Sequence, residues 1–189
     1  MTREEALKLL SQNVKNQNLI KHMLATEAVM KALYLKLNQD PNTEGIEDWG
    51  IVGLLHDLDY ELCKDHPKKH GMVSAEKLNG KLDPSLIHAI MAHNYKYTKV
   101  IPSSLMDWSI SCCDELTGLI IASTLISPDK KLALVTPAFV LNRFKEKSFA
   151  RGANREQIKM CEEKLNIPLS EFVTIGLTAM QKIAVDLGL

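Results

Sequence analysis

Residues 18–38 read NLIKHMLATEAVMKALYLKLN, and the spacing within this stretch decides the fold class. Its apolar residues recur at steps of three and four, which is the spacing of one face of an α-helix. The same spacing continues along almost the whole chain, and no convincing run of strict alternation bounded by hairpin signals interrupts it. The sequence therefore predicts an all-α protein.

Helix boundaries are marked by capping residues and prolines. Thr2 and Glu5 resemble a capping box that opens a first helix, Asp40-Pro41 ends the second, and Pro67 suits the first turn of a later one. Further helices are expected at about 46–58, 67–79, 84–94, 104–125, 138–147, 154–166 and 170–187. The sequence contains no internal repeat or linker, so we expect one compact domain over 1–189. It should have a core with the candidate site at about 18–125 and a C-terminal helical extension at about 128–189.

Composition excludes several classes of partner. The 23 Lys and Arg balance 23 Asp and Glu, so no bulk field attracts nucleic acid or an anionic membrane. The longest nearly apolar run, 118–126, is far shorter than the roughly 20 residues that cross a bilayer. The four cysteines form no Cys-x-x-Cys pair, and no secretory signal precedes them. We expect a soluble cytoplasmic protein without a membrane partner, and leave homodimerisation open.

The histidines are clustered. Five of the six lie within 38 residues, and the last 96 residues contain none. His22 shares a helical line with three apolar residues and should face the core, and Asp114 has apolar neighbours at the same spacing. A buried carboxylate requires a cation or a raised pKa, so His22, His56, Asp57 and Asp114 together suit divalent zinc, iron, manganese or magnesium. Taken singly, His56-Asp57 is more typical of a capped helix end, and His22 of a satisfied core histidine.

The motif Gly53-Leu54-Leu55-His56-Asp57, with His22 one helix earlier and Asp114 in a later helix, resembles the HD-domain superfamily of metal-dependent phosphohydrolases. The stretches 69–76 and 89–94 resemble the subgroup in which two further histidines, here His70 and His93, bind a second metal. This resemblance covers about 21–119.

The resemblance implies an all-helical fold with one or two divalent ions, iron being favoured if there are two. One ion would be held by His22, His56, Asp57 and Asp114, the other by Asp57, His70 and His93, with Asp57 bridging and His56-Asp57 as the catalytic pair. The stretches 56–61, 148–157 and 179–183 also look like a small prokaryotic branch of predicted hydrolases in this superfamily.

The remaining polar residues near the motif have simpler interpretations. His88 stands five residues before His93, so the two point about 140° apart on a helix and do not easily share an ion. His66 precedes Pro67 and is interpreted as a bystander. Asp59, like its neighbours Glu61 and Asp65, is expected to be a solvated loop carboxylate, with an outer-shell role for Asp59 as the alternative.

A phosphoryl group requires cations or free backbone N–H groups. Lys69 is adjacent to His70, and Lys96 follows His93 by three residues. The basic segment 143–155 contributes Arg151 and Arg155, either as phosphate ligands or as part of a solvated basic face. The sequence predicts a phosphohydrolase acting on a small phosphorylated molecule, most simply a nucleotide. The alternatives are a di-iron oxygenase on the same ligands and a non-catalytic nucleotide-binding protein.

Overall fold

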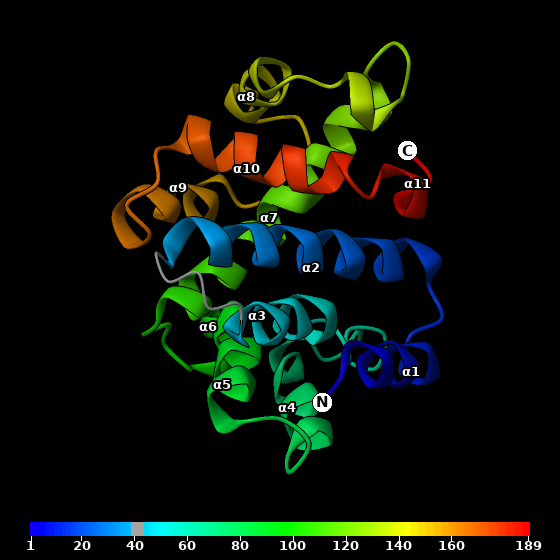
Figure 1. Ribbon diagram of the computed structural model, residues 1–189, viewed down its shortest axis with the longest axis vertical. Helices are drawn as coiled ribbons and strands as arrows, with labels where there is room; N and C mark the ends of the chain where they lie inside the picture. The colour runs from blue at the N-terminus through cyan, green and yellow to red at the C-terminus, as the bar shows by residue number, and fades with distance from the viewer. Residues whose placement is uncertain (39–43) are drawn as a thin grey trace.

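The computed structural model describes residues 1–38 and 44–189, and every regular element in these residues is a helix (Figure 1). The elements are α1 Arg3–Asn13, α2 Gln17–Leu37, α3 Glu44–Leu55, the 3-10 helix η1 Pro67–Lys69, α4 Met72–Leu78, α5 Pro84–His93, α6 Tyr95–Thr98, α7 Leu105–Ile126, the 3-10 helix η2 Leu132–Leu134, α8 Pro137–Lys145, α9 Arg155–Lys164, α10 Leu169–Gln181 and α11 Ala184–Leu187. The prediction of an all-α fold is confirmed.

Helix α2 lies across the middle of the molecule (Figure 1). Helices α1, α3, α4 and α5 lie on one side of it, and α8, α10 and α11 on the other. Helix α7 contacts both groups, since it packs against α2, α5, α8 and α9. The two longest helices, α2 and α7, therefore form the frame on which the site is built.

Helix α7 is the core helix. It is long and apolar enough to cross a membrane, but 61% of its most apolar 18-residue stretch is buried within the protein. Ile110, Leu116 and Ile120 on this helix are fully buried. Cys112 and Cys113 are buried beside them, and burial raises the pKa of both thiols. Core packing therefore accounts for this helix and for its two cysteines.

Helices α2 and α3 approach closely at Gly53. A Cβ atom at this position would lie 2.8 Å from the backbone of Glu27 on α2. Such a distance is shorter than any ordinary van der Waals contact, so only glycine fits here. This contact fixes the end of α3, and with it the position of His56 and Asp57, relative to α2.

Several predicted boundaries are confirmed and others are wrong. The capping box of Thr2 and Glu5 is present, while Asp40-Pro41 lies outside the described residues. The helix predicted at 46–58 begins at Glu44 and ends at Leu55. The helix predicted at 170–187 is α10 followed by the separate short α11, and α6 was not predicted.

The helix predicted at 67–79 is also interrupted. It divides into η1 and α4, because Gly71 has a φ of +88°, outside the helical region. This break sets His70 between the two elements instead of within a helix.

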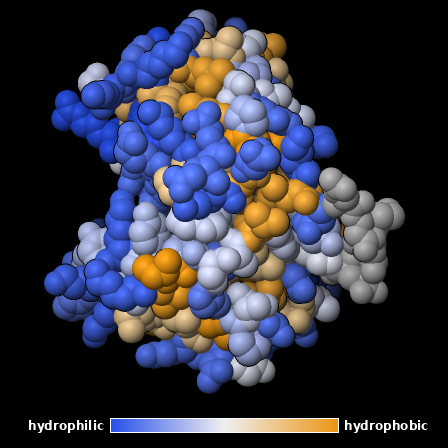
Figure 2. Space-filling model, turned by 90° about the vertical axis from the view of Figure 1, so that its left-hand side faces the viewer, coloured by the Kyte–Doolittle hydropathy of each residue, from blue (hydrophilic) through white to orange (hydrophobic). Residues whose placement is uncertain are grey.

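The surface is mixed. Figure 2 shows one face, on which hydrophobic patches lie between hydrophilic areas. The exposed large apolar side chains come from separate elements and include Leu35, Ile101, Leu134 and Val185. Scattered exposed apolar residues are normal in globular proteins and indicate no particular function.

Candidate metal centre

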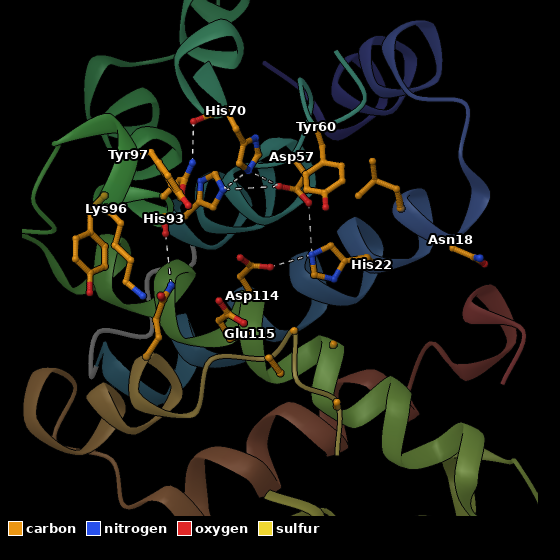
Figure 3. Close-up of a pocket in the computed structure, with 18 of the residues that line it drawn as sticks. Asn18, His22, Asp57, Tyr60, His70, His93, Lys96, Tyr97, Asp114 and Glu115 are labelled. Carbon is orange, nitrogen blue, oxygen red and sulfur yellow. Dashed lines mark hydrogen bonds and ion pairs between the residues drawn. The ribbon is translucent and has the colours of Figure 1, made fainter. Parts of the chain in front are cut away.

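Six side chains from five parts of the chain meet at one place. Figure 3 labels all of them except His56. They are His22 on α2, His56 and Asp57 directly after α3, His70 before α4, His93 at the end of α5, and Asp114 on α7. They form two groups, His22 with His56 and Asp114, and Asp57 with His70 and His93. In each group the ligand atoms lie within 4.8 Å of one another. The structure thus brings together all six residues that the sequence nominated as metal ligands.

The carboxylate of Asp57, which belongs to the second group, also faces the histidines of the first. One of its oxygens, Oδ2, is 3.7 Å from Nε2 of His22. The other, Oδ1, is 3.6 Å from Nε2 of His56, 3.1 Å from Nε2 of His70 and 3.7 Å from Nε2 of His93. The side chain is thus placed as a carboxylate that bridges two cations would be.

Two of the four imidazoles are held by the backbone of their own helix ends. Nδ1 of His56 donates to the carbonyl oxygen of Gly53 at 2.9 Å, and Nδ1 of His93 donates to the carbonyl oxygen of Ile90. Because a carbonyl can only accept, Nδ1 must carry the proton in both rings. In the neutral form of each ring, Nε2 then has the lone pair that a cation or a second proton can take.

The other two imidazoles are held by side chains. Nδ1 of His70 donates to Oδ1 of Asp59 at 2.8 Å. Nδ1 of His22 lies 3.1 Å from the hydroxyl of Thr117, which itself donates to the carbonyl oxygen of Asp114 and therefore accepts from His22. All four rings thus direct Nε2 toward the two carboxylates, and such outer contacts are typical of metal-binding histidines.

The donor set fits a cation on two observations. Nε2 of His56 is fully buried and has no hydrogen-bond partner. Nε2 of His70 and Nε2 of His93 are 2.9 Å apart, and two lone pairs at that distance repel one another unless a cation or a proton lies between them. Buried nitrogens in this arrangement are suited to binding zinc, iron or manganese.

The electrostatics of the centre favour positive charge. Burial opposes protonation of His56 and His70, but the nearby carboxylates, above all Asp57, outweigh it and raise the pKa of His56 to about 9 and that of His70 to about 10. Burial, and then His70 and His56, lower the pKa of His93 to about 4. The histidines hold the pKa of Asp57 and of Asp114 below the usual range in spite of burial. The carboxylates that would stabilise a bound cation thus also favour protonation of His56 and His70.

Asp59 is not the solvated loop carboxylate that the sequence analysis favoured. It is fully buried, and besides His70 it accepts the backbone N–H groups of Gly71 at 2.9 Å and Ser74 at 2.8 Å. These N–H groups lie at the start of α4, where a helix leaves its donors unsatisfied. Asp59 therefore joins the break before α4 to the ring of His70, which corresponds to the outer-shell alternative. Its neighbour Glu61 is exposed and accepts the backbone N–H of Lys15.

The centre opens into a cleft of about 780 Å³. Tyr60, Tyr97, Lys96 and Glu115 lie around it (Figure 3). Of the four predicted substrate-binding residues, the structure brings only Lys96 to the cleft. Lys69 and Arg151 are exposed elsewhere, and the guanidinium of Arg155 donates to backbone carbonyl groups. The sequence therefore overestimated how many cations the cleft contains.

Glu115 and Gln157 are cleft residues that the sequence analysis missed. Glu115 accepts the backbone N–H of Asn154 at 2.7 Å, and burial followed by the charge of Asp114 raises its pKa to about 7. Gln157 donates to the backbone oxygen of Ser111 at 2.9 Å. Both depend on segments about 40 residues apart in the chain, and no local pattern signals them.

The two remaining histidines lie outside the centre, as expected. His66 is exposed, and Nδ1 of His88 lies 3.1 Å from Oδ2 of Asp107. Neither belongs to the two ligand groups.

No known protein family, curated protein or solved structure matches this chain. What stands is an all-helical protein with a buried histidine and aspartate cluster that could hold a metal ion.

Proposed function

We propose that this chain is a metal-dependent phosphohydrolase of the HD-domain type, which cleaves a phosphate ester or anhydride of a small molecule such as a nucleotide. One observation carries the proposal: the carboxylate of Asp57 lies within 3.7 Å of histidine nitrogens from both groups, at a cleft large enough for a small-molecule ligand. The chemistry of this donor set and the resemblance of the 53–57 motif support the same assignment.

The residues of the centre divide between two divalent ions. His22, His56 and Asp114 would hold one, His70 and His93 the other, and Asp57 would contribute to both. Two divalent ions lower the pKa of a shared water toward neutrality from about 15.7 in bulk. Iron is our first choice of metal, because four imidazoles and two carboxylates suit it well.

The chain's own side chains would orient the substrate. The ammonium group of Lys96 is exposed at the cleft and has no ion-pair partner among the described residues. We assign it to a phosphoryl oxygen, because free phosphate oxygens bind cations that are already in place. Asp59 and Thr117 act behind the ligands and fix the rings of His70 and His22.

The test begins with metal content. Protein from medium supplemented with iron, manganese and zinc is expected to contain about two divalent ions per chain, as the two ligand groups require. Asp57→Asn should retain at most one. The matched control is His66→Gln, which alters an exposed histidine outside the centre and should retain both. Wild-type protein without stoichiometric metal would refute the proposal.

Activity is then measured without oxygen on a panel of nucleoside monophosphates, cyclic dinucleotides and simple phosphate esters. Asp57→Asn and His56→Ala are each expected to lower turnover by more than about a hundredfold, since even residues behind metal ligands contribute 10–100-fold. Metal-loaded protein that releases no phosphate from any of these but consumes oxygen would favour the di-iron oxygenase alternative.

A further inference from the structure

The segment 149–154, which we call the strap, connects α8 to α9 and forms part of the cleft wall. Ala150, Gly152 and Ala153 line the cleft, whereas Arg151 is exposed and does not. Gly118, one helical turn after Asp114 on α7, lines the same cleft. The basic segment thus reaches the site, but through its small residues and not through its arginines.

Arg155 holds the strap. Its guanidinium donates to the carbonyl oxygens of Phe149 at 2.6 Å, Ala150 at 2.5 Å and Ala153 at 2.7 Å. A fourth, longer bond reaches the carbonyl oxygen of Phe144 at 3.4 Å. Arginine has five N–H donors, so these bonds leave little capacity for a phosphate. Ala150 adopts a φ of +42°, which is rare for a residue with a side chain, and its carbonyl lies within this grip.

Glu115 connects the strap to α7, the helix that carries Asp114. Its Oε2 accepts the backbone N–H of Asn154 at 2.7 Å, and the residue before it on α7 is the ligand Asp114. Glu115 therefore joins the strap directly to α7, next to Asp114, while Arg155 holds the strap's own backbone.

The two glycines face open space. A Cβ atom at Gly118 or at Gly152 would have no heavy atom within 4 Å. Both residues line the cleft, and a Cβ atom can be added at either one without a clash. Nε2 of His56 is fully buried and has no hydrogen-bond partner. It points toward the carboxylates of Asp57 and Asp114, which line the same cleft.

We propose that the strap and Gly118 form the subsite for the uncharged organic part of the substrate, and that Glu115 and Arg155 are the residues that position it. Small side chains leave room for bulk, and the strap turns no charged side chain into the cleft. The inference rests on the proposed hydrolase function, in which this organic part is the leaving group.

A pair of esters tests the subsite. Phenyl phosphate and methyl phosphate share the phosphoryl group and differ in the size of an uncharged leaving group. Gly118→Leu and Gly152→Leu should each raise KM for phenyl phosphate at least about tenfold, because steric differences in a pocket are worth 10–200-fold. KM for methyl phosphate should change less than about threefold, a shift too small for a lost contact. Gly118→Ala is the intermediate size, and metal content should be unchanged in all three variants.

Folding defects are separable in this design. Leucine and alanine are better helix formers than glycine, so the Tm of the Gly118 variants should not fall. An equal effect on both esters, or none on either, would overturn the subsite. A wild type with full metal content that hydrolyses neither these esters nor the wider panel would instead overturn the proposed function, and the subsite with it.

Positioning by Arg155 has a readout that does not depend on catalysis. Arg155→Met should release the strap and speed tryptic cleavage after Arg151 about tenfold, since local opening governs proteolysis. It should raise KM for phenyl phosphate while preserving metal content, and Arg155→Lys should restore part of both effects. Arg143→Met is the control, because this arginine of the same basic segment pairs with Glu146 and lies over the ring of Phe139. Unchanged cleavage and KM in Arg155→Met would refute the positioning role.

Discussion

The Asp59→Asn substitution removes one charge from a fully buried side chain and preserves its size. In the native protein the carboxylate accepts from Nδ1 of His70 at 2.8 Å and from the backbone N–H groups of Gly71 at 2.9 Å and Ser74 at 2.8 Å. Asparagine offers one acceptor oxygen and an NH₂ group that can only donate. At least one of the three buried donors must then face another donor.

The magnitude follows from these contacts. A hydrogen bond to a charged group contributes about 1.5–3 kcal/mol, and a buried donor left without a partner costs about 1–3 kcal/mol. We expect the free energy of unfolding of the metal-free protein to fall by about 3 kcal/mol. The ring of His70 also loses its carboxylate partner, so affinity for the ion held by His70 and His93 should fall about 10–100-fold. The ion held by His22, His56 and Asp114 should be affected much less.

Urea unfolding measures the first effect, and a metal titration followed by elemental analysis measures the second. Ser74→Ala is the matched control, because it removes only the hydroxyl that accepts the backbone N–H of Asp59 at 3.1 Å. We expect that control to lose about 1 kcal/mol and to retain both ions. Equal loss of the two ions in Asp59→Asn, or no loss of either, would refute the assignment of Asp59 to His70.

Four further predictions follow from the same geometry. Gly53→Ala should destabilise the fold by about 2 kcal/mol, because its Cβ would lie 2.8 Å from the backbone of α2; an unchanged urea midpoint would contradict this. Thr117→Val removes the hydroxyl that accepts from His22, so affinity for the ion held by His22, His56 and Asp114 should fall about tenfold in a chelator competition. Equal affinities in the variant and the wild type would show that this hydrogen bond does not contribute to metal binding. Because the pKa of His56 is raised to about 9 and that of His70 to about 10, binding of both ions at pH 7 should release about two protons. Calorimetry in two buffers of different ionisation enthalpy measures this release. The stabilisation by these two raised pKa values is fully present below pH 6.5 and is lost as the pH rises through 9 to 10. Because bound ions displace these protons, metal affinity should increase with pH up to that range and level off above it; a pH-independent affinity would count against protonated imidazoles.

Much of the architecture could be predicted because helical periodicity and capping are local. The capping box of Thr2 and Glu5 needs only four residues of chain, and the break at Gly71 is the kind of feature that this reasoning misses. The all-helical fold of the described residues follows from the same repeating pattern. The predicted start of α4 was wrong because the N–H groups there are satisfied by a group outside the helix, the carboxylate of Asp59.

The sequence by itself determined the helical class and nominated His22, His56, Asp57 and Asp114, because helical spacing and ligand residue types can be read from the chain. The family resemblance added His70 and His93. Only the tertiary structure decided what surrounds them. It buried Asp59 against His70, and it used Arg155 to hold the strap instead of a phosphate. The physical reason is that a side chain's partners are set by segments tens of residues away, and a charge in the sequence does not say which donor or acceptor it will meet.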